Sequence, residues 1–235
     1  MKRMIFICGL HRSGTTLLEH YLYSSFETCA LRASVPENEG QFLQDVYQPA
    51  YKYGGPGKFA FSKKMEDDLL TLNEFSEYRK KIMRSWSNYV VGEGDFLIEK
   101  SPPNITKMWW LRKVFPDAIF IVWTRDPRAV SGATQKWSNT SLHELMQHWN
   151  TAYSIAKNDI SSDTIVIQYE DFCMSPENCF EKSGIEKFIK RRAKPIALEK
   201  RFHNISNTNA RYIELFEDII IGKGIWEDFG YNLNI

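Results

Sequence analysis

The segment with the clearest chemical meaning lies near the amino terminus, where residues 9–16 read Gly-Leu-His-Arg-Ser-Gly-Thr-Thr. Gly9 and Gly14 keep the spacing of the loop that binds nucleotide phosphates, and they lie between an expected strand and an expected helix. Backbone N–H groups and the dipole at the start of a helix attract an anion. The residues expected to hold that anion are Arg12, Ser13, Gly14, Thr15 and Thr16.

Position 15 separates this loop from the loop of most nucleotide triphosphatases and kinases. Those proteins have a lysine there, which reaches the β and γ phosphates. This chain has Thr15, and the nearby cation is Arg12. The loop therefore favours an anion other than a magnesium-bound triphosphate, with a phosphate-loop nucleoside or small-molecule kinase as the main alternative.

A second possible anion site follows the apolar run at residues 118–123. Arg125 comes directly after this expected strand, and Pro127 suits the first turn of a helix. A guanidinium at the carboxyl end of a strand can bind a phosphate with two hydrogen bonds. The alternative is that Arg125 and Arg128 only pair with Asp126 or with solvent-exposed acids.

Together these segments resemble the sulfotransferase superfamily, whose first loop reads roughly Pro-Lys/Arg-Ser-Gly-Thr-Thr-x-Leu. Residues 10–18 read Leu-His-Arg-Ser-Gly-Thr-Thr-Leu-Leu, and they look closest to the arginine-containing branch, which includes protein-tyrosine and many bacterial sulfotransferases. The resemblance implies 3'-phosphoadenosine 5'-phosphosulfate (PAPS) as sulfuryl donor and no metal. It also implies that the loop binds the 5'-phosphosulfate, that Arg12 assists the leaving oxygen, and that Arg125 binds the 3'-phosphate.

The same family usually has a serine eight residues after the second arginine, but position 133 is alanine here. Either Ser131 or Thr134 could supply that hydroxyl. Residues 169–172 read Tyr-Glu-Asp-Phe and resemble a family segment in which the tyrosine, here Tyr169, lies near the nucleotide. Glu170 and Asp171 are expected only to begin a helix.

A third segment, residues 96–104, also runs from an expected strand into a polar turn. It resembles the Glu-Lys-Ser/Thr-Pro segment of many carbohydrate and bacterial sulfotransferases. That resemblance implies that Lys100 and Ser101 contact the donor or the acceptor. The alternative is a capping turn in which Glu99 and Lys100 form a solvated pair.

Sulfuryl transfer to a hydroxyl also needs a group that removes the acceptor proton. In the protein-tyrosine branch a glutamate soon after the second strand is the base, and the matching candidates are Glu37 and then Glu39. His11 is a third candidate because it lies in the loop, whereas His148, beside a tryptophan, is expected to pack a helix. Alternatively, the two glutamates only complement the dipole of a helix start.

The elements that would position these residues alternate along the chain. Apolar runs at residues 4–8, 28–31, 96–98, 118–123 and 164–167 predict strands, and residues 15–25, 63–89, 105–115, 127–136 and 141–157 predict helices. The alternation predicts an α/β, P-loop-type three-layer fold: a central, mainly parallel sheet flanked by helices, as one domain over residues 1–235. Residues 49–62, rich in glycine and proline, predict a lid or an acceptor-binding loop.

Composition limits the remaining function classes. The chain has 235 residues, of which 43% are hydrophobic and 25% charged, and this is enough for one hydrophobic core. Its net charge of +1 argues against a surface that binds nucleic acid or anionic membranes. Four cysteines without a paired pattern and no long apolar run predict reduced thiols, no membrane span and a cytoplasmic location. A small-molecule, glycan, lipid or peptide hydroxyl could be the acceptor, and a catalytically silent nucleotide-binding protein is a second alternative.

Overall fold

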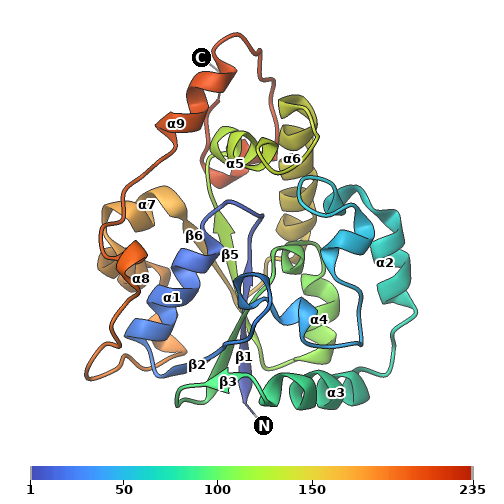
Figure 1. Ribbon diagram of the computed structural model, residues 1–235, viewed down its shortest axis with the longest axis vertical. Helices are drawn as coiled ribbons and strands as arrows, with labels where there is room; N and C mark the ends of the chain where they lie inside the picture. The colour runs from blue at the N-terminus through green and yellow to red at the C-terminus, as the bar shows by residue number, and fades with distance from the viewer. Residues whose placement is uncertain (1, 234–235) are drawn as a thin grey trace.

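The computed structural model describes residues 2–233, and its sheet has six strands in the order β3-β2-β4-β1-β5-β6 (Figure 1). All pairs are parallel except β2 with β3, so the predicted mainly parallel sheet is confirmed. The strands are β1 (Arg3–Cys8), β2 (Thr28–Leu31), β3 (Val90–Val91), β4 (Phe96–Lys100), β5 (Ile119–Thr124) and β6 (Thr164–Gln168).

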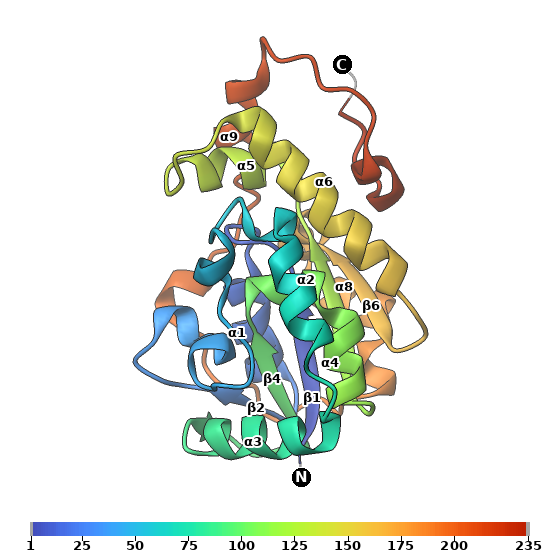
Figure 2. The ribbon, with the colours of Figure 1, turned by 90° about the vertical axis from the view of Figure 1, so that its right-hand side faces the viewer.

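Helices cover both faces of the sheet, because successive side chains of each strand point to opposite sides. Ile5 and Ile7 of β1 pack toward α1 (Thr15–Ser25), α7 (Tyr169–Met174) and α8 (Pro176–Ser183). Phe6 packs on the other side, toward α3 (Phe75–Ser87), α4 (Met108–Val114) and α6 (Leu142–Asp159) (Figure 2). The three-layer α/β prediction is confirmed.

Two predicted helices are interrupted. The helix expected over residues 63–89 is split into α2 (Lys63–Leu70) and α3, because Leu72 turns away and its carbonyl accepts the indole N–H of Trp110 at 3.2 Å. The helix expected over residues 105–115 starts only at Met108, since Pro102–Thr106 forms a 3-10 turn before it.

Residues 32–62 form an excursion of short 3-10 turns between β2 and α2, as the glycine and proline content predicted for its second half. The turns are Pro36–Asn38, Gly40–Phe42, Ala50–Tyr53 and Phe59–Phe61. His148 of α6 holds the end of the excursion: its Nε2 accepts the backbone N–H of Ala60 at 3.2 Å, and its ring meets the Phe59 ring at 4.8 Å. His148 is therefore a packing residue, as predicted.

The carboxyl-terminal region, which the sequence did not place, crosses the carboxyl ends of the strands. It passes α1, where the Tyr21 hydroxyl donates to the Phe202 carbonyl at 3.1 Å. It then forms α9 (Ala210–Ile213) beside α5 (Pro127–Gln135), and finally packs Trp226 against Trp149 of α6 (Figure 1). None of the helices in residues 2–233 is long and apolar enough to span a membrane.

Candidate active site

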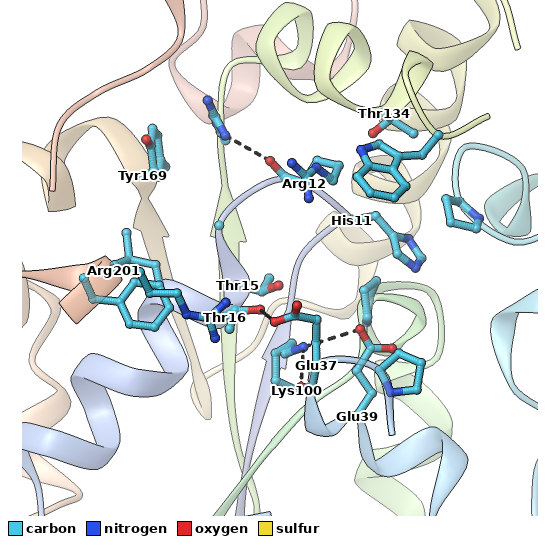
Figure 3. A pocket seen from close by; sticks show the side chains of 18 of the residues that line it. His11, Arg12, Thr15, Thr16, Glu37, Glu39, Lys100, Thr134, Tyr169 and Arg201 are labelled. Carbon is cyan, nitrogen blue, oxygen red and sulfur yellow. Dashed lines mark hydrogen bonds and ion pairs between the residues drawn. The ribbon is translucent and has the colours of Figure 1, made fainter. Parts of the chain in front are cut away.

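A cavity of about 710 Å³ opens at the carboxyl ends of the central strands. Arg12 of the first loop and Arg125 at the end of β5 both line it, so the two expected anion sites share one cleft. Figure 3 shows Tyr169 and Arg201 on one side of this cleft, His11 and Thr134 on the other, and Glu37 and Lys100 between them. Parallel strands bring these residues together because their carboxyl ends meet at one edge of the sheet.

The loop after β1 leaves the start of α1 open. Gly14 has φ of 100°, and a Cβ atom there would lie 3.2 Å from the Tyr169 ring, so the position requires glycine. Helix α1 has no side-chain cap and no acidic residue in its first turn. Its first N–H groups therefore point to a place suited to an anion. Ser13 does not line the cavity; its hydroxyl donates to the Leu10 carbonyl at 2.6 Å and holds the loop.

Arg12 is exposed and lies next to an aromatic ring. Its backbone has φ of 65°, and its guanidinium carbon lies 5.4 Å from the centre of the Trp137 ring. The exposed Arg12 side chain has room to turn toward a ligand. Its backbone is held in place, because the Arg12 carbonyl accepts a hydrogen bond from the Arg125 guanidinium at 2.9 Å.

Arg125 is buried and held from several directions. Its Nε donates to Asn209 Oδ1 at 2.8 Å and its Nη2 to Thr208 Oγ1 at 3.0 Å. The guanidinium carbon lies 4.2 Å above the Tyr169 ring. The proposed pairing with Asp126 is wrong for Arg125, because the Asp126 carboxylate binds Arg128 at 2.8 Å.

Glu170 corrects the expectation that it only begins a helix. Its carboxylate accepts the Asp126 N–H at 2.9 Å, the Asn209 side-chain amide at 2.5 Å and the Tyr231 hydroxyl at 2.9 Å. These three hydrogen bonds hold the carboxylate in place. Through Asn209, Glu170 fixes the guanidinium at the end of β5.

Lys100 reaches the cleft from β4, where it lies opposite Ile7 of β1. Its ammonium donates to the Glu37 carbonyl at 3.0 Å and lies 3.4 Å from Glu39 Oε1. Glu39 is buried and also accepts from the Gln41 side chain; its burial raises the pKa of the carboxyl, against the opposing effects of Lys100 and Gln41.

The alternative of a solvated Glu99–Lys100 pair is wrong. Both side chains are buried, with Glu99 at 0% exposure. Glu99 accepts the Gly40 N–H at 3.0 Å and the Asn104 amide at 2.5 Å. Glu99 thus joins the turn at Gly40 to the end of β4. This link holds the excursion of residues 32–62 beside the cleft.

Glu37 lies in a strained turn and faces the cleft. Glu37 has a φ of 47° and Asn38 a φ of 55°. Glu37 and Glu39 therefore do not occupy the first turn of an α-helix. The Glu37 carboxylate is exposed and accepts the Thr16 hydroxyl at 3.2 Å. This contact connects the candidate base directly to the phosphate loop.

The remaining predicted residues lie around two neighbouring cavities. His11 and Thr134 line both the main cleft and a small cavity next to it, whereas Ser131 lines only the small cavity. The Ser131 hydroxyl has no hydrogen-bond partner among the described residues. Burial, with the nearby positive charges of Lys100 and Arg12, lowers the pKa of His11 to about 3.

The sequence missed the wall that closes the Tyr169 side of the cleft. The Tyr169 hydroxyl donates to the Ser206 carbonyl at 3.1 Å and so anchors this wall. No sequence motif predicts this wall, and the one feature of the sequence that hints at it is the run of mostly polar residues at 203–209. It consists of Arg201, Phe202, Asn204, Ile205, Ser206 and Thr208.

The structure is an α/β protein of the P-loop type in which Arg12 and Arg125 line one cleft. Residues 4–182 match the profile of the sulfotransferase family. The chain therefore belongs to the sulfotransferase family, whose members are transferases. No curated protein matches the chain closely enough to count as a relative.

Solved structures show the same fold. The sulfotransferase domain of the Synechococcus PCC 7002 olefin synthase is 17% identical, with a TM-score of 0.54 over 99% of this chain and 97% of that one. A sulfotransferase domain from the curacin biosynthetic pathway is 15% identical, with a TM-score of 0.57 over 99% of both chains. A Mycobacterium avium sulfotransferase is 14% identical, with a TM-score of 0.52 over 94% of this chain and 69% of that one.

Proposed function

We propose that the protein transfers a sulfuryl group from PAPS to a hydroxyl-bearing acceptor. The observation that carries this proposal is the shared cleft, in which open helix N–H groups and Arg12 lie near the buried Arg125. A donor with phosphate groups on both the 3' and the 5' oxygen of its ribose needs two such cationic sites. A nucleotide without the 3'-phosphate would leave the Arg125 site unused.

The donor side of the cleft is defined here as Arg125, Tyr169 and the wall of residues 201–208. We assign the 5'-phosphosulfate to the first turn of α1 and the 3'-phosphate to Arg125. Thr208 supplies a hydroxyl next to that guanidinium, at 3.0 Å from Nη2. With alanine at position 133, Thr208 is a better partner for the 3'-phosphate than Ser131, which lines the other cavity.

The transfer is an in-line displacement at sulfur. The acceptor oxygen forms a bond to sulfur while the bond from sulfur to the bridging phosphate oxygen breaks, and adenosine 3',5'-bisphosphate leaves with the electron pair. Arg12 and Lys100 lie where they can stabilise negative charge on the transferring and leaving oxygens. The acceptor proton goes to a carboxylate.

Glu37 is the base that the geometry supports best. Glu39 has one oxygen bound by Gln41 and the other paired with Lys100, and it is buried. His11, with a pKa near 3, is a weak base at neutral pH. The Glu37 carboxylate is exposed and lines the cavity, and within residues 2–233 its one hydrogen bond comes from the Thr16 hydroxyl.

Calorimetry with the desulfated donor tests the proposal. Adenosine 3',5'-bisphosphate should bind far more tightly than adenosine 5'-monophosphate or ATP with magnesium, because only it uses both anion sites. Equal affinity for the monophosphate would contradict the assignment. Tight binding of the bisphosphate without transfer of radiolabelled sulfate to any acceptor would indicate a silent nucleotide-binding protein instead.

A further inference from the structure

The cleft has a second side, formed by a different part of the chain. We call it the acceptor side: the lining contributed by residues 36–56 together with Pro102 and Trp137. Its apolar members are Pro36, Phe42, Ala50, Tyr51, Pro56, Pro102 and Trp137. The same cavity contains Arg12 and Glu37, so a molecule on these surfaces would lie beside the proposed reacting groups.

Two aromatic side chains on the acceptor side are unusually exposed. Tyr51 is 60% exposed and stacks on Phe42, with ring centres 6.4 Å apart and an angle of 13° between the planes. Trp137 is 72% exposed and lies beside the Arg12 guanidinium. Large exposed aromatic surfaces that line a cavity are typical of a binding site for an apolar partner.

The polar side chains on this side are largely bound to one another. The Gln41 side-chain amide donates to Glu39, and its Oε1 atom accepts the Ala50 N–H at 2.8 Å. Lys100 is bound to Glu39 and to the Glu37 carbonyl. These bonds fix the wall and leave few side-chain groups free to bind an incoming ligand.

On the acceptor side, the Glu37 carboxylate and the exposed Tyr51 hydroxyl lie outside this network, and His11 and Thr134 line the cavity beside it. They are enough to orient and deprotonate one hydroxyl. A sugar would bring several hydroxyls against Phe42, Tyr51 and the prolines, and hydroxyls that lose water without gaining a partner oppose binding.

We infer that the acceptor carries a single reacting hydroxyl on a flat apolar ring, as a phenol does, and is not a polyhydroxylated sugar. This inference rests on the proposed function. Tyr51 and Trp137 would bind the ring, and the hydroxyl would point to Glu37. Residues 36–56 thus select the acceptor, while the first loop and Arg125 hold the donor.

The first test compares two acceptors with PAPS as donor. The probes are 2-naphthol and methyl β-D-glucopyranoside, and the measurement is kcat/KM for transfer of radiolabelled sulfate. We expect 2-naphthol to be preferred by at least about a hundredfold, the order by which a site rejects a ligand whose polar groups it cannot pair. Equal use or preference of the glucoside, or transfer to neither, would overturn the inference.

The second test changes the two exposed rings. Trp137→Ala and Tyr51→Ala should each raise the KM for 2-naphthol by about tenfold, the order of one aromatic contact, and leave the KM for PAPS unchanged. Trp137→Phe should restore most of the loss. Tyr89→Ala is the control, because Tyr89 is 37% exposed and does not line the cleft. Equal effects of all three alanine variants, or no effect of either cleft variant, would overturn the inference.

Calorimetry with adenosine 3',5'-bisphosphate separates this inference from the proposed function. If the bisphosphate binds tightly but 2-naphthol is not sulfated, only the acceptor class is wrong. If the bisphosphate binds no better than adenosine 5'-monophosphate, the proposed function is wrong as well.

Discussion

Arg12 and Arg125 carry the same charge in one cleft, but the protein holds them in opposite ways. Arg125 is 5% exposed, donates to Asn209, Thr208 and the Arg12 carbonyl, and lies over a tyrosine ring. Arg12 is exposed, and its guanidinium has a ring contact with Trp137. One guanidinium is fixed before any ligand arrives, and the other is free to adjust.

We expect this difference to divide donor binding and catalysis between the two arginines. A preorganised guanidinium loses little conformational freedom when it binds a phosphate, so it contributes to affinity in the ground state. An exposed guanidinium that contacts the leaving oxygen mainly once charge develops there stabilises the transition state more than the bound donor, which lowers the barrier. Arg125 should therefore determine donor affinity, and Arg12 should determine turnover.

The largest expected effect is on turnover. Arg12→Ala should lower kcat by about 10²–10³-fold, the usual loss when one group that stabilises developing charge is removed, and change the Kd of adenosine 3',5'-bisphosphate by much less. Steady-state kinetics and calorimetry give the two numbers. Arg128→Ala is a matched control, since Arg128 pairs with Asp126 at the start of α5. An unchanged kcat would remove Arg12 from the leaving-group role.

Arg125→Ala should show the converse pattern. The Kd of the bisphosphate should rise by about 10–100-fold, as expected for the loss of charged hydrogen bonds to a phosphate. The affinity for adenosine 5'-monophosphate should hardly change, because that ligand lacks the 3'-phosphate. A similar loss of affinity for both nucleotides would mean that Arg125 does not bind the 3'-phosphate. The proposed division of roles between Arg125 and Arg12 would then be wrong.

Asn209→Ala tests whether the fixed position of Arg125 matters. This variant keeps the arginine but removes its Nε partner and one partner of Glu170. We expect the bisphosphate to bind about 5–10-fold more weakly, which corresponds to about 1 kcal/mol, the value of one typical hydrogen bond. Asn178→Ala, at an exposed position of α8, is the control. Unchanged affinity would show that the guanidinium needs no support.

The smallest effect concerns acid stability at the end of the excursion of residues 32–62. Burial lowers the pKa of His148 from 6.5 to about 3, and its neutral Nε2 accepts the Ala60 N–H. The unfolded chain binds this proton more readily, so the stabilisation is complete above about pH 6.5 and is lost as the pH falls toward 3.

His148→Gln should therefore remove part of this acid sensitivity, since glutamine can accept the same N–H without titrating. Between pH 6.5 and 4.5 the wild type should lose roughly 2 kcal/mol more unfolding free energy than the variant. Urea unfolding at both pH values measures the difference, with the exposed His203→Gln as control. Parallel losses in wild type and variant would contradict the prediction.

Much of this architecture follows from local sequence. Residues 15–25 and 28–31 were predicted with the bounds that α1 and β2 have, because periodicity and the glycine loop are properties of neighbouring residues. The meeting of Arg12, Glu37, Lys100 and Arg125 in one cleft also follows from sequence. Each comes soon after or at the end of a parallel strand, and these ends share one edge.

Only the tertiary structure decided what surrounds those residues. Arg125 is held by residues 83 and 84 positions later, and the helix break near Leu72 depends on Trp110, 38 positions away. The exposure of Tyr51 and Trp137 likewise depends on how distant segments pack. Such contacts depend on the path of the whole chain. A sequence therefore specifies which groups can do chemistry, and long-range packing decides which of them are held still, which stay free and which ligand they can select.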